Sequence, residues 1–176
     1  MTTTQFSVGE KVVYPNHGVG IIEQISSRTI GSSVERFYLL RIRSSSLKVM
    51  VPFQNAEAVG MRRIVKNSEV QTILEYLSDG KCESSLDWKN RFKENSDKMR
   101  TGSLLEVAIV LKGLLILAAM KPLSFREKKM LERARFLLIS EMAMARGREE
   151  EEVEEELRLA LSKCKLRWPE ATSIEV

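Results

Sequence analysis

The first third of the chain carries short hydrophobic runs that turn-forming residues separate. Apolar, β-branched and aromatic residues concentrate at positions 11–14, 19–25, 37–43 and 47–51. Clusters rich in Pro, Asn, Gly and Ser divide these runs at positions 15–18, 31–33 and 44–46. Strands of this length, divided by turns at short intervals, predict a small antiparallel β-barrel.

After residue 52 the hydrophobic period changes from that of strands to that of helices. Val70, Ile73, Leu74 and Leu77 recur at helical spacing, and Asp79-Gly80 is typical of a helix end. Further helices are expected at about residues 86–100, 104–120, 125–145 and 149–165. The remainder of the chain therefore reads as helical.

Three of the expected helices begin with residues that favour a helix start. Ser124 with Glu127, and Ser103 with Glu106, have the spacing of a capping box, in which each residue bonds the other's backbone. Ser84 and Asp87 are further start signals, which place Trp88 in the first turn of its helix.

These patterns together predict an α+β fold, with a small antiparallel barrel followed by a compact all-α domain. We expect the first domain at residues 1–66, a connecting helix at 67–80, and the helical domain at 81–176. The last helix of that domain starts with a run of glutamates at 149–156, which a helix N-terminus favours electrostatically.

The segment 104–120 is the most apolar in the chain, but it is expected to be a buried helix. It is shorter than the roughly 20 residues that a membrane span needs, and it contains Glu106 and Lys112. The polar start Thr2-Thr3-Thr4 is unlike a secretory leader. We therefore expect no membrane association and a cytoplasmic protein.

Positive charge is concentrated around Trp88. Lys and Arg exceed Asp and Glu in residues 1–66 and again in 81–148, whereas acids dominate 67–80 and 149–176. Such a basic block favours binding to phosphates without reading a sequence. Trp88 itself admits two interpretations, because it shares helical spacing with Phe92 and Met99 and could pack in the core, or it could reach a partner from the helix edge.

Residues that would support catalysis or metal binding are missing from the pattern. Cys82 and Cys164 lie far apart, and His17 is the single histidine. Gly18 and Gly20 lack the third glycine and the following helix of a nucleotide-binding loop. We therefore expect no enzyme activity, no catalytic residues, no metal and no cofactor.

Three separated motifs resemble the CarD family of bacterial transcription regulators. The run at 6–20 is similar to the family's opening, 87–95 followed by Gly102 resembles its tryptophan helix, and 123–131 with Ala134-Arg135 resembles a later helix. The order and spacing agree from about residue 6 to 146. A chain of 176 residues is too short for the transcription-repair coupling factor, which shares the N-terminal module.

The resemblance implies a Tudor-like first domain that binds the β subunit of RNA polymerase, and a helical domain that meets promoter DNA. In the family, the tryptophan wedges into the minor groove at the upstream fork of the bubble and stabilises the open complex. Here that residue is Trp88, and the chain is expected to act as a monomer on the polymerase, largely independently of sequence. The DNA-binding candidates that accompany Trp88 are Arg91, Lys93, Lys128 and Lys129.

The polymerase contacts implied by the resemblance are only partly present. Arg28 matches a family position that contacts the polymerase, but Met50 stands where the family has a second basic contact. Arg41 or Arg43 could compensate, or the contact could be weaker or more apolar. The candidate polymerase-binding residues are therefore Arg28, Arg41, Arg43 and Met50.

Two functions follow from these observations. The leading hypothesis is a polymerase-bound regulator that stabilises open complexes through Trp88 and nearby cations. The alternative is an adaptor that joins two proteins without contacting DNA, in which case Trp88 would be a core residue. The sequence does not indicate which promoters respond or whether the outcome is activation or repression.

Overall fold

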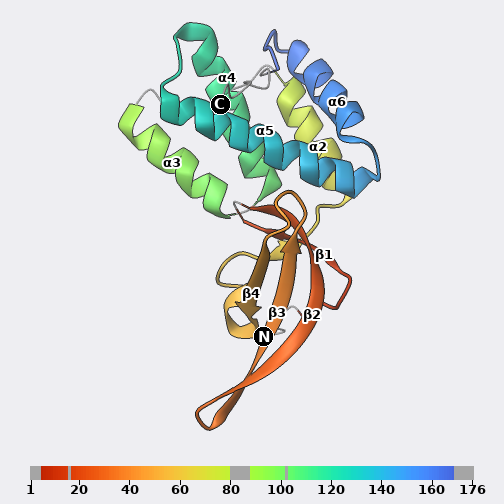
Figure 1. The fold of residues 1–176 in the computed structure, drawn as a ribbon. Helices are drawn as coiled ribbons and strands as arrows, with labels where there is room; N and C mark the ends of the chain where they lie inside the picture. The colour runs from red at the N-terminus through yellow and green to blue at the C-terminus, as the bar shows by residue number, and fades with distance from the viewer. Residues whose placement is uncertain (1–4, 16, 80–87, 102, 169–176) are drawn as a thin grey trace. The chain divides into compact units, whose positions relative to one another are not determined.

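The computed structural model describes residues 5–15, 17–79, 88–101 and 103–168, with the backbone alone for 88–91. The chain forms two compact units, Met1–Ile64 and Val65–Val176, which are described separately. The first unit is built from strands and the second from helices (Figure 1). The predicted α+β class is therefore confirmed.

The first unit is a five-stranded antiparallel sheet in the order β4-β3-β2-β1-β5. Its elements are β1 (Lys11–Tyr14), β2 (Gly18–Ile30), β3 (Ser33–Ile42), β4 (Lys48–Pro52), the short helix α1 (Phe53–Ala56) and β5 (Arg62–Arg63). The sheet is open, so the predicted closed barrel needs correction. In the described residues β5 is two residues long and pairs only with β1, while β4 pairs only with β3.

One face of the sheet carries the core of this unit. Val12, Ile22, Tyr38 and Leu40 are at most 1% exposed. Phe6, Ala56 and Met61 complete this core from outside the five strands, and the Phe6 backbone N–H donates to the Tyr38 hydroxyl at 3.2 Å. Segments beside the strands therefore cover the apolar face that a closed barrel would bury against itself.

The β2–β3 hairpin is longer than the hydrophobic pattern predicts. β2 runs to Ile30 rather than residue 25, and β3 begins at Ser33 rather than residue 37. Gly31 has φ +63°, a conformation that glycine adopts without strain, and this allows a two-residue connection. The prediction stopped early because Ser26, Ser27 and Arg28 interrupt the apolar run, although strand pairing continues through them.

The second unit packs five helices around one core. They are α2 (Asn67–Ser78), α3 (Trp88–Thr101), α4 (Leu104–Met120), α5 (Phe125–Arg146) and α6 (Glu150–Ser162). The most buried of them is α4, which packs against α2, α3 and α5. None of the helices in the described residues is both long and apolar enough to cross a membrane.

Both ends of α2 are held by buried charged side chains. Glu141 of α5 is 2% exposed and accepts the backbone N–H of Val65 at 3.0 Å, just before α2 begins. Lys112 of α4 is 1% exposed and donates to the carbonyls of Tyr76, at 2.7 Å, and Asp79. The segment 67–80, expected to connect the domains, thus contains a helix that contributes Val70, Ile73 and Leu77 to this core.

The two predicted capping boxes have different outcomes. At α5, the Ser124 hydroxyl accepts the Glu127 N–H at 3.3 Å and the Ser124 N–H donates to Glu127 Oε1 at 3.0 Å, so this box is confirmed. At α4, Ser103 is the N-cap but makes no side-chain cap bond, and the Glu106 carboxylate accepts from the Thr101 hydroxyl instead. The predicted box at Ser103 is therefore wrong, because the Glu106 carboxylate bonds the Thr101 hydroxyl and not the Ser103 backbone N–H.

Ion pairs join α5 to α6. Trp168 Nε1 donates to Glu154 Oε1 at 2.8 Å, and the Arg135 guanidinium bonds the same carboxylate. Burial alone would raise the pKa of Glu154, but the bonds from Trp168 and Arg135 outweigh it and lower the pKa below its usual value. Some of the acids in the glutamate run thus have specific partners, whereas Glu149, Glu150, Glu151 and Glu152 are exposed.

Candidate functional site

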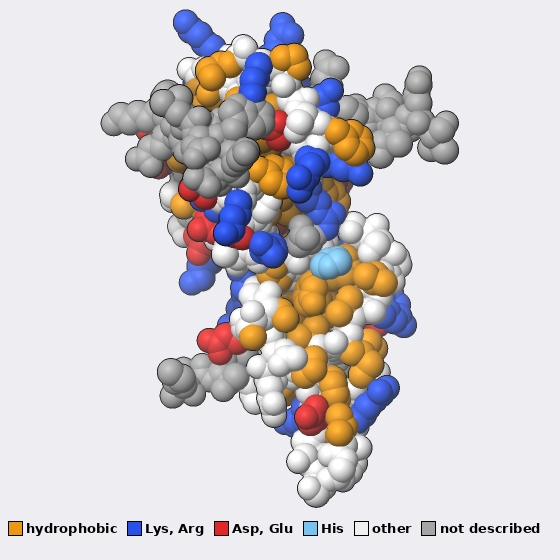
Figure 2. All heavy atoms as spheres, turned by 90° about the vertical axis from the view of Figure 1, so that its left-hand side faces the viewer, with side chains coloured by type: hydrophobic (Ala, Val, Ile, Leu, Met, Phe, Trp, Pro, Cys, Tyr) orange, Lys and Arg blue, Asp and Glu red, His pale blue; other side chains and the backbone are white. Residues whose placement is uncertain are grey.

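The start of α5 and the N-terminal half of α3 form a basic surface on the helical unit. The Arg126 guanidinium carbon lies 4.3 Å from the centroid of the Phe92 ring, which ties α5 to α3. Lys129 Nζ lies 4.6 Å from the centroid of the Phe125 ring. Figure 2 shows Lys and Arg side chains beside hydrophobic ones on the face that includes α3. We call Phe92, Phe125, Arg126 and Lys129, with Lys93 and Lys128, the basic surface.

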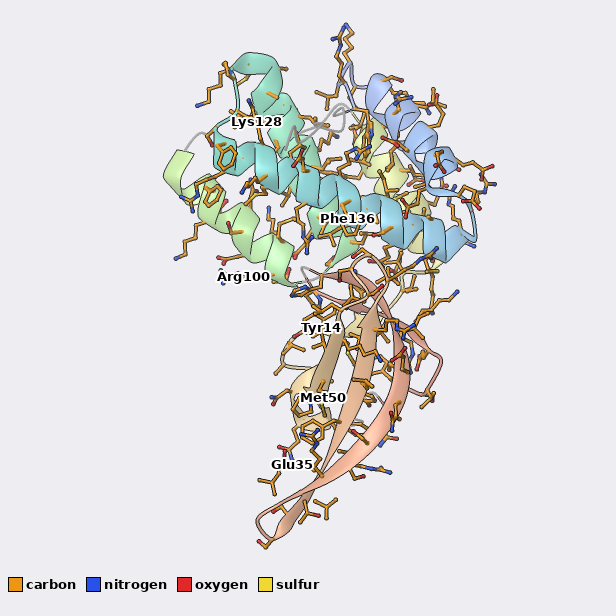
Figure 3. The ribbon with its side chains drawn as sticks, viewed as in Figure 1. Tyr14, Glu35, Met50, Arg100, Lys128 and Phe136 are labelled. Carbon is orange, nitrogen blue, oxygen red and sulfur yellow. The ribbon has the colours of Figure 1, made fainter. Side chains whose placement is uncertain are left out.

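Local structure explains why these side chains face outward. Glu127 is 4% exposed because it is used in the capping box, which fixes the first turn of α5. Its neighbours Phe125, Arg126, Lys128 and Lys129 are all exposed, and Phe125 is 71% exposed. In Figure 3, Lys128 lies near the start of α5, on the side of the unit where α3 lies. A rigid helix start thus presents cations and one aromatic ring to solvent.

The face of α3 that carries Phe92 also anchors the helix on the core. Met99 is 5% exposed and Asn95 is 9% exposed, and Phe92 lies on the same side at helical spacing. Trp88 is the first residue of α3, so its expected place in the first turn of a helix is confirmed. The side chains of Trp88 and Arg91 lie outside the described residues, as do the start signals Ser84 and Asp87.

The predicted DNA-binding residues whose side chains are described lie on two helices, α3 and α5, which the contact of Arg126 with Phe92 joins. Lys93 is exposed on α3, while Lys128 and Lys129 are exposed on α5. The sequence analysis missed Arg126 and Phe125, although the spacing of Phe125 and Lys129 at i and i+4 could have indicated their contact. The pairing of Arg126 with Phe92 joins residues far apart in the chain, so no local pattern could have revealed it.

Three of the four predicted polymerase-binding residues lie on the other face of the sheet. Tyr38, Leu40 and Ile42 point into the core, so alternation along β3 places Glu35, Leu39 and Arg41 on the opposite face. Strand pairing sets Arg28 opposite Glu35 and Met50 opposite Leu39. We call this side the outer face; Figure 3 labels Met50 and Glu35 on β4 and β3.

The centre of the outer face is apolar and its margin is charged. Met50 is 40% exposed, next to the partly buried Leu39. Arg41 Nε lies 2.6 Å from Glu23 Oε1, and Lys48 Nζ lies 3.8 Å from Glu23 Oε2. Both cations are more than half exposed, so these are weak surface pairs that a partner can exchange.

Arg28 and Arg43 lie near opposite ends of β3: Arg28 is paired with Glu35 close to its start, and Arg43 follows its last residue. Arg28 is exposed on the part of the β2–β3 hairpin that β4 does not reach. Arg43 follows β3, its side chain is exposed, and its backbone N–H donates to the Val19 carbonyl at 3.0 Å. Arg28, Arg41 and Met50 therefore share one face, and Arg43 lies beyond the end of that strand.

The described part of the chain contains no cluster of metal-binding side chains. No three His, Cys, Asp or Glu side chains among those residues gather closely enough to hold a metal ion. Cys164 Sγ instead donates to the carbonyls of Leu77, at 3.3 Å, and Asp79, at 2.9 Å. Cys164 therefore packs against the C-terminal end of α2.

Comparison with known proteins places both units in one family. Residues 6–65 match the CarD-like/TRCF RID domain, and residues 72–158 match the CarD C-terminal domain. The chain is 34% identical over 142 residues to a Bacillus subtilis (strain 168) protein named "Putative transcription factor YdeB". That stretch covers 81% of this chain and 93% of the relative. With both units matched in order, and a relative covered over nearly its whole length, this chain belongs to the CarD family.

Proposed function

We propose that this protein is a transcription regulator that binds the β subunit of RNA polymerase and stabilises promoter open complexes. The observation that carries the proposal is the basic surface, because it lies on the helix that starts with Trp88 and on the adjoining start of α5. The name of the Bacillus subtilis relative supports a role in transcription.

The basic surface supplies the general affinity for DNA. Lys93, Lys128 and Lys129 bind backbone phosphates, and phosphate contacts position a protein without reading the bases. Trp88, supported by Arg91, inserts into the minor groove at the upstream edge of the bubble. An inserted ring offsets part of the unstacking cost and prevents the step from restacking, so it favours melted DNA. The effect extends to promoters of different sequence.

The outer face of the sheet supplies the polymerase contact. Arg28 and Arg41 lie at the charged margin, and Met50 with Leu39 forms an apolar centre. The centres of protein interfaces are depleted of charge and enriched in Met. Met50 therefore supports a polymerase contact that is more apolar at this position, and not the loss of the contact. Arg43 contributes beyond the end of β3. The protein acts as a monomer on the polymerase, in the cytoplasm at the nucleoid, and catalyses no reaction.

The experiment that tests this function is the lifetime of a promoter open complex formed by a bacterial RNA polymerase. The intact protein is expected to lengthen the lifetime, and Trp88→Ala to abolish the gain while the helical unit stays folded. Arg28→Glu is expected to weaken polymerase binding and leave the fork-DNA affinity of the full chain unchanged. Lys165→Gln, an exposed lysine outside the basic surface, serves as the control.

The adaptor without DNA contact is the alternative function. It predicts that Trp88→Ala lowers the folding stability of the helical unit, because Trp88 is then a core residue. It also predicts no change in open-complex lifetime with intact protein that demonstrably binds polymerase. Either result would overturn the proposed function.

A further inference from the structure

A groove runs between α2 and α6, two helices that pack against each other on the side of the helical unit away from α3 (Figure 1). Its volume is about 300 Å³. Its walls include Gln71, Leu74 and Ser78 from α2, Glu156 and Leu159 from α6, and Lys163, which follows α6 directly. On each side these residues lie at i, i+3 and i+7, so the groove follows the length of both helices.

The floor of the groove is apolar and open to solvent. Leu159 is 56% exposed, although Val153, Leu157 and Leu161 on the same helix are fully buried. Leu74 is partly buried beside it, and Ala160, at 7% exposed, leaves room between them. Leu159 is therefore an apolar residue of α6 that lies outside the hydrophobic core of this unit.

The charge around the groove is mainly negative. Glu75 and Glu156 line it, and the exposed residues Glu149, Glu150, Glu151 and Glu152 continue along the first turn of α6. Glu156 is bonded by Arg146 and by Arg148, the latter at 2.8 Å, so Glu75 and the four exposed glutamates supply the negative charge. Among the described residues that line the groove Lys163 is the one basic side chain, and the exposed Lys165 and Arg167 follow it beyond the end of α6. Such a field repels nucleic acid and attracts a cationic segment.

We propose that this groove docks a basic amphipathic helix of a protein partner. Two parallel helical walls with an apolar floor suit a third helix, whose anchors at i, i+3, i+4 and i+7 meet Leu74 and Leu159. Lysine or arginine residues on the flanks of that helix meet Glu75 and the glutamates of α6. The groove and the basic surface have opposite charge and lie on different helices, so the protein can bind DNA and this partner together.

The test uses a synthetic amidated peptide of about five turns, roughly 18 residues, with Leu at the four anchor positions and Lys elsewhere. Backbone amide NMR shifts of the full-length protein are followed as this peptide is added. A second peptide, with Ser in place of each Leu, has the same charge. Leu159→Asn removes the exposed floor residue, and Leu47→Asn, at a 48% exposed leucine of the sheet unit, is the matched control.

The Leu peptide is expected to shift the amides of Leu74, Ser78 and Leu159, and Leu159→Asn is expected to weaken its binding about tenfold, or about 1.4 kcal/mol. Leu47→Asn leaves the affinity unchanged. Equal binding of the Ser peptide, or undiminished binding to Leu159→Asn, would show attraction by charge alone and overturn the proposal. Shifts of the groove amides with protein concentration, without peptide, would make a second copy the occupant and overturn it as well.

Discussion

Replacing Ser124 with alanine tests whether the capping box holds the start of α5. The substitution removes the hydroxyl that accepts the Glu127 backbone N–H, and it leaves in place the bond from the residue 124 backbone N–H to the buried Glu127 carboxylate. Loss of an N-cap side chain costs typically about 1 kcal/mol, within a range of roughly 0.5 to 2 kcal/mol. Ser124 is exposed, so no cavity adds to this cost.

Ser103→Ala is the matched control, because Ser103 occupies the N-cap of α4 without a side-chain cap bond. Its effect is expected to stay within about 0.5 kcal/mol, as for surface substitutions in general. Both tryptophans of the chain, Trp88 and Trp168, belong to the helical unit. Urea unfolding followed by tryptophan fluorescence therefore reports this unit, even if the two units unfold separately.

Ser124→Ala is also expected to lower the affinity for fork DNA, because fraying of the first turn of α5 loosens Lys128 and Lys129. A loss of stability no greater than that of Ser103→Ala would show that the box does not hold the start of α5. A lowered unfolding midpoint with fork-DNA binding as tight as that of the unaltered protein would show that the first turn of α5 does not position Lys128 and Lys129 for DNA.

Three further predictions concern the two surfaces and the α5–α6 ion pairs. Met50→Asp is expected to weaken polymerase binding more than Lys48→Asp does, because it places a charge at the apolar centre of the outer face; pull-down or calorimetric titration with the β subunit would detect the reverse order. Each Lys→Gln substitution at Lys93, Lys128 or Lys129 should reduce the slope of log affinity against log salt by about 1, and unchanged slopes would remove that lysine from the interface. The lowered pKa of Glu154 means that its stabilising contribution is complete above the ordinary carboxyl value of 4.5 and disappears as the pH falls through the lower folded-state pKa. The stability difference between the unaltered protein and Glu154→Gln should therefore be constant near neutral pH and shrink below 4.5 in pH-dependent urea unfolding; a difference that grows there would contradict the sign.

The pattern of hydrophobic residues was sufficient to predict the class of fold and the order of its elements, because burial on one face repeats at a fixed period along each element. The starts of α4 and α5 were predicted at the observed residues because Ser103 and Ser124 indicate the N-caps that both helices have. The pairing of Ser103 with Glu106 was wrong because the Glu106 carboxylate accepts from the Thr101 hydroxyl, which the preceding helix supplies, instead of from the Ser103 backbone N–H. The predicted closed barrel was wrong because β5, formed by Arg62 and Arg63, is only two residues long. Nothing in the sequence around these two arginines indicates the length of that strand.

The candidate surfaces were predicted unevenly for a related reason. Lys93, Lys128 and Lys129 were identifiable as single cations, but their arrangement around Phe92 and Phe125 depends on how α3 meets α5. Strand alternation could assign Arg41 to a wet face, yet only the observed register shows that Met50 faces Leu39. Tertiary contacts of this kind are encoded by packing across the whole unit and leave no local signal.

The bond from Glu141 to the Val65 N–H has a consequence for binding strength. β5 ends at Arg63 and the helical unit is fastened at Val65, so Ile64 is the single residue between two fixed stretches of backbone. A tether this short keeps one unit within a small volume once the other is bound, and that raises its effective concentration at a nearby target. Under the proposed function, a DNA surface of low intrinsic affinity is then well occupied on the polymerase while it binds poorly to free DNA elsewhere in the cell.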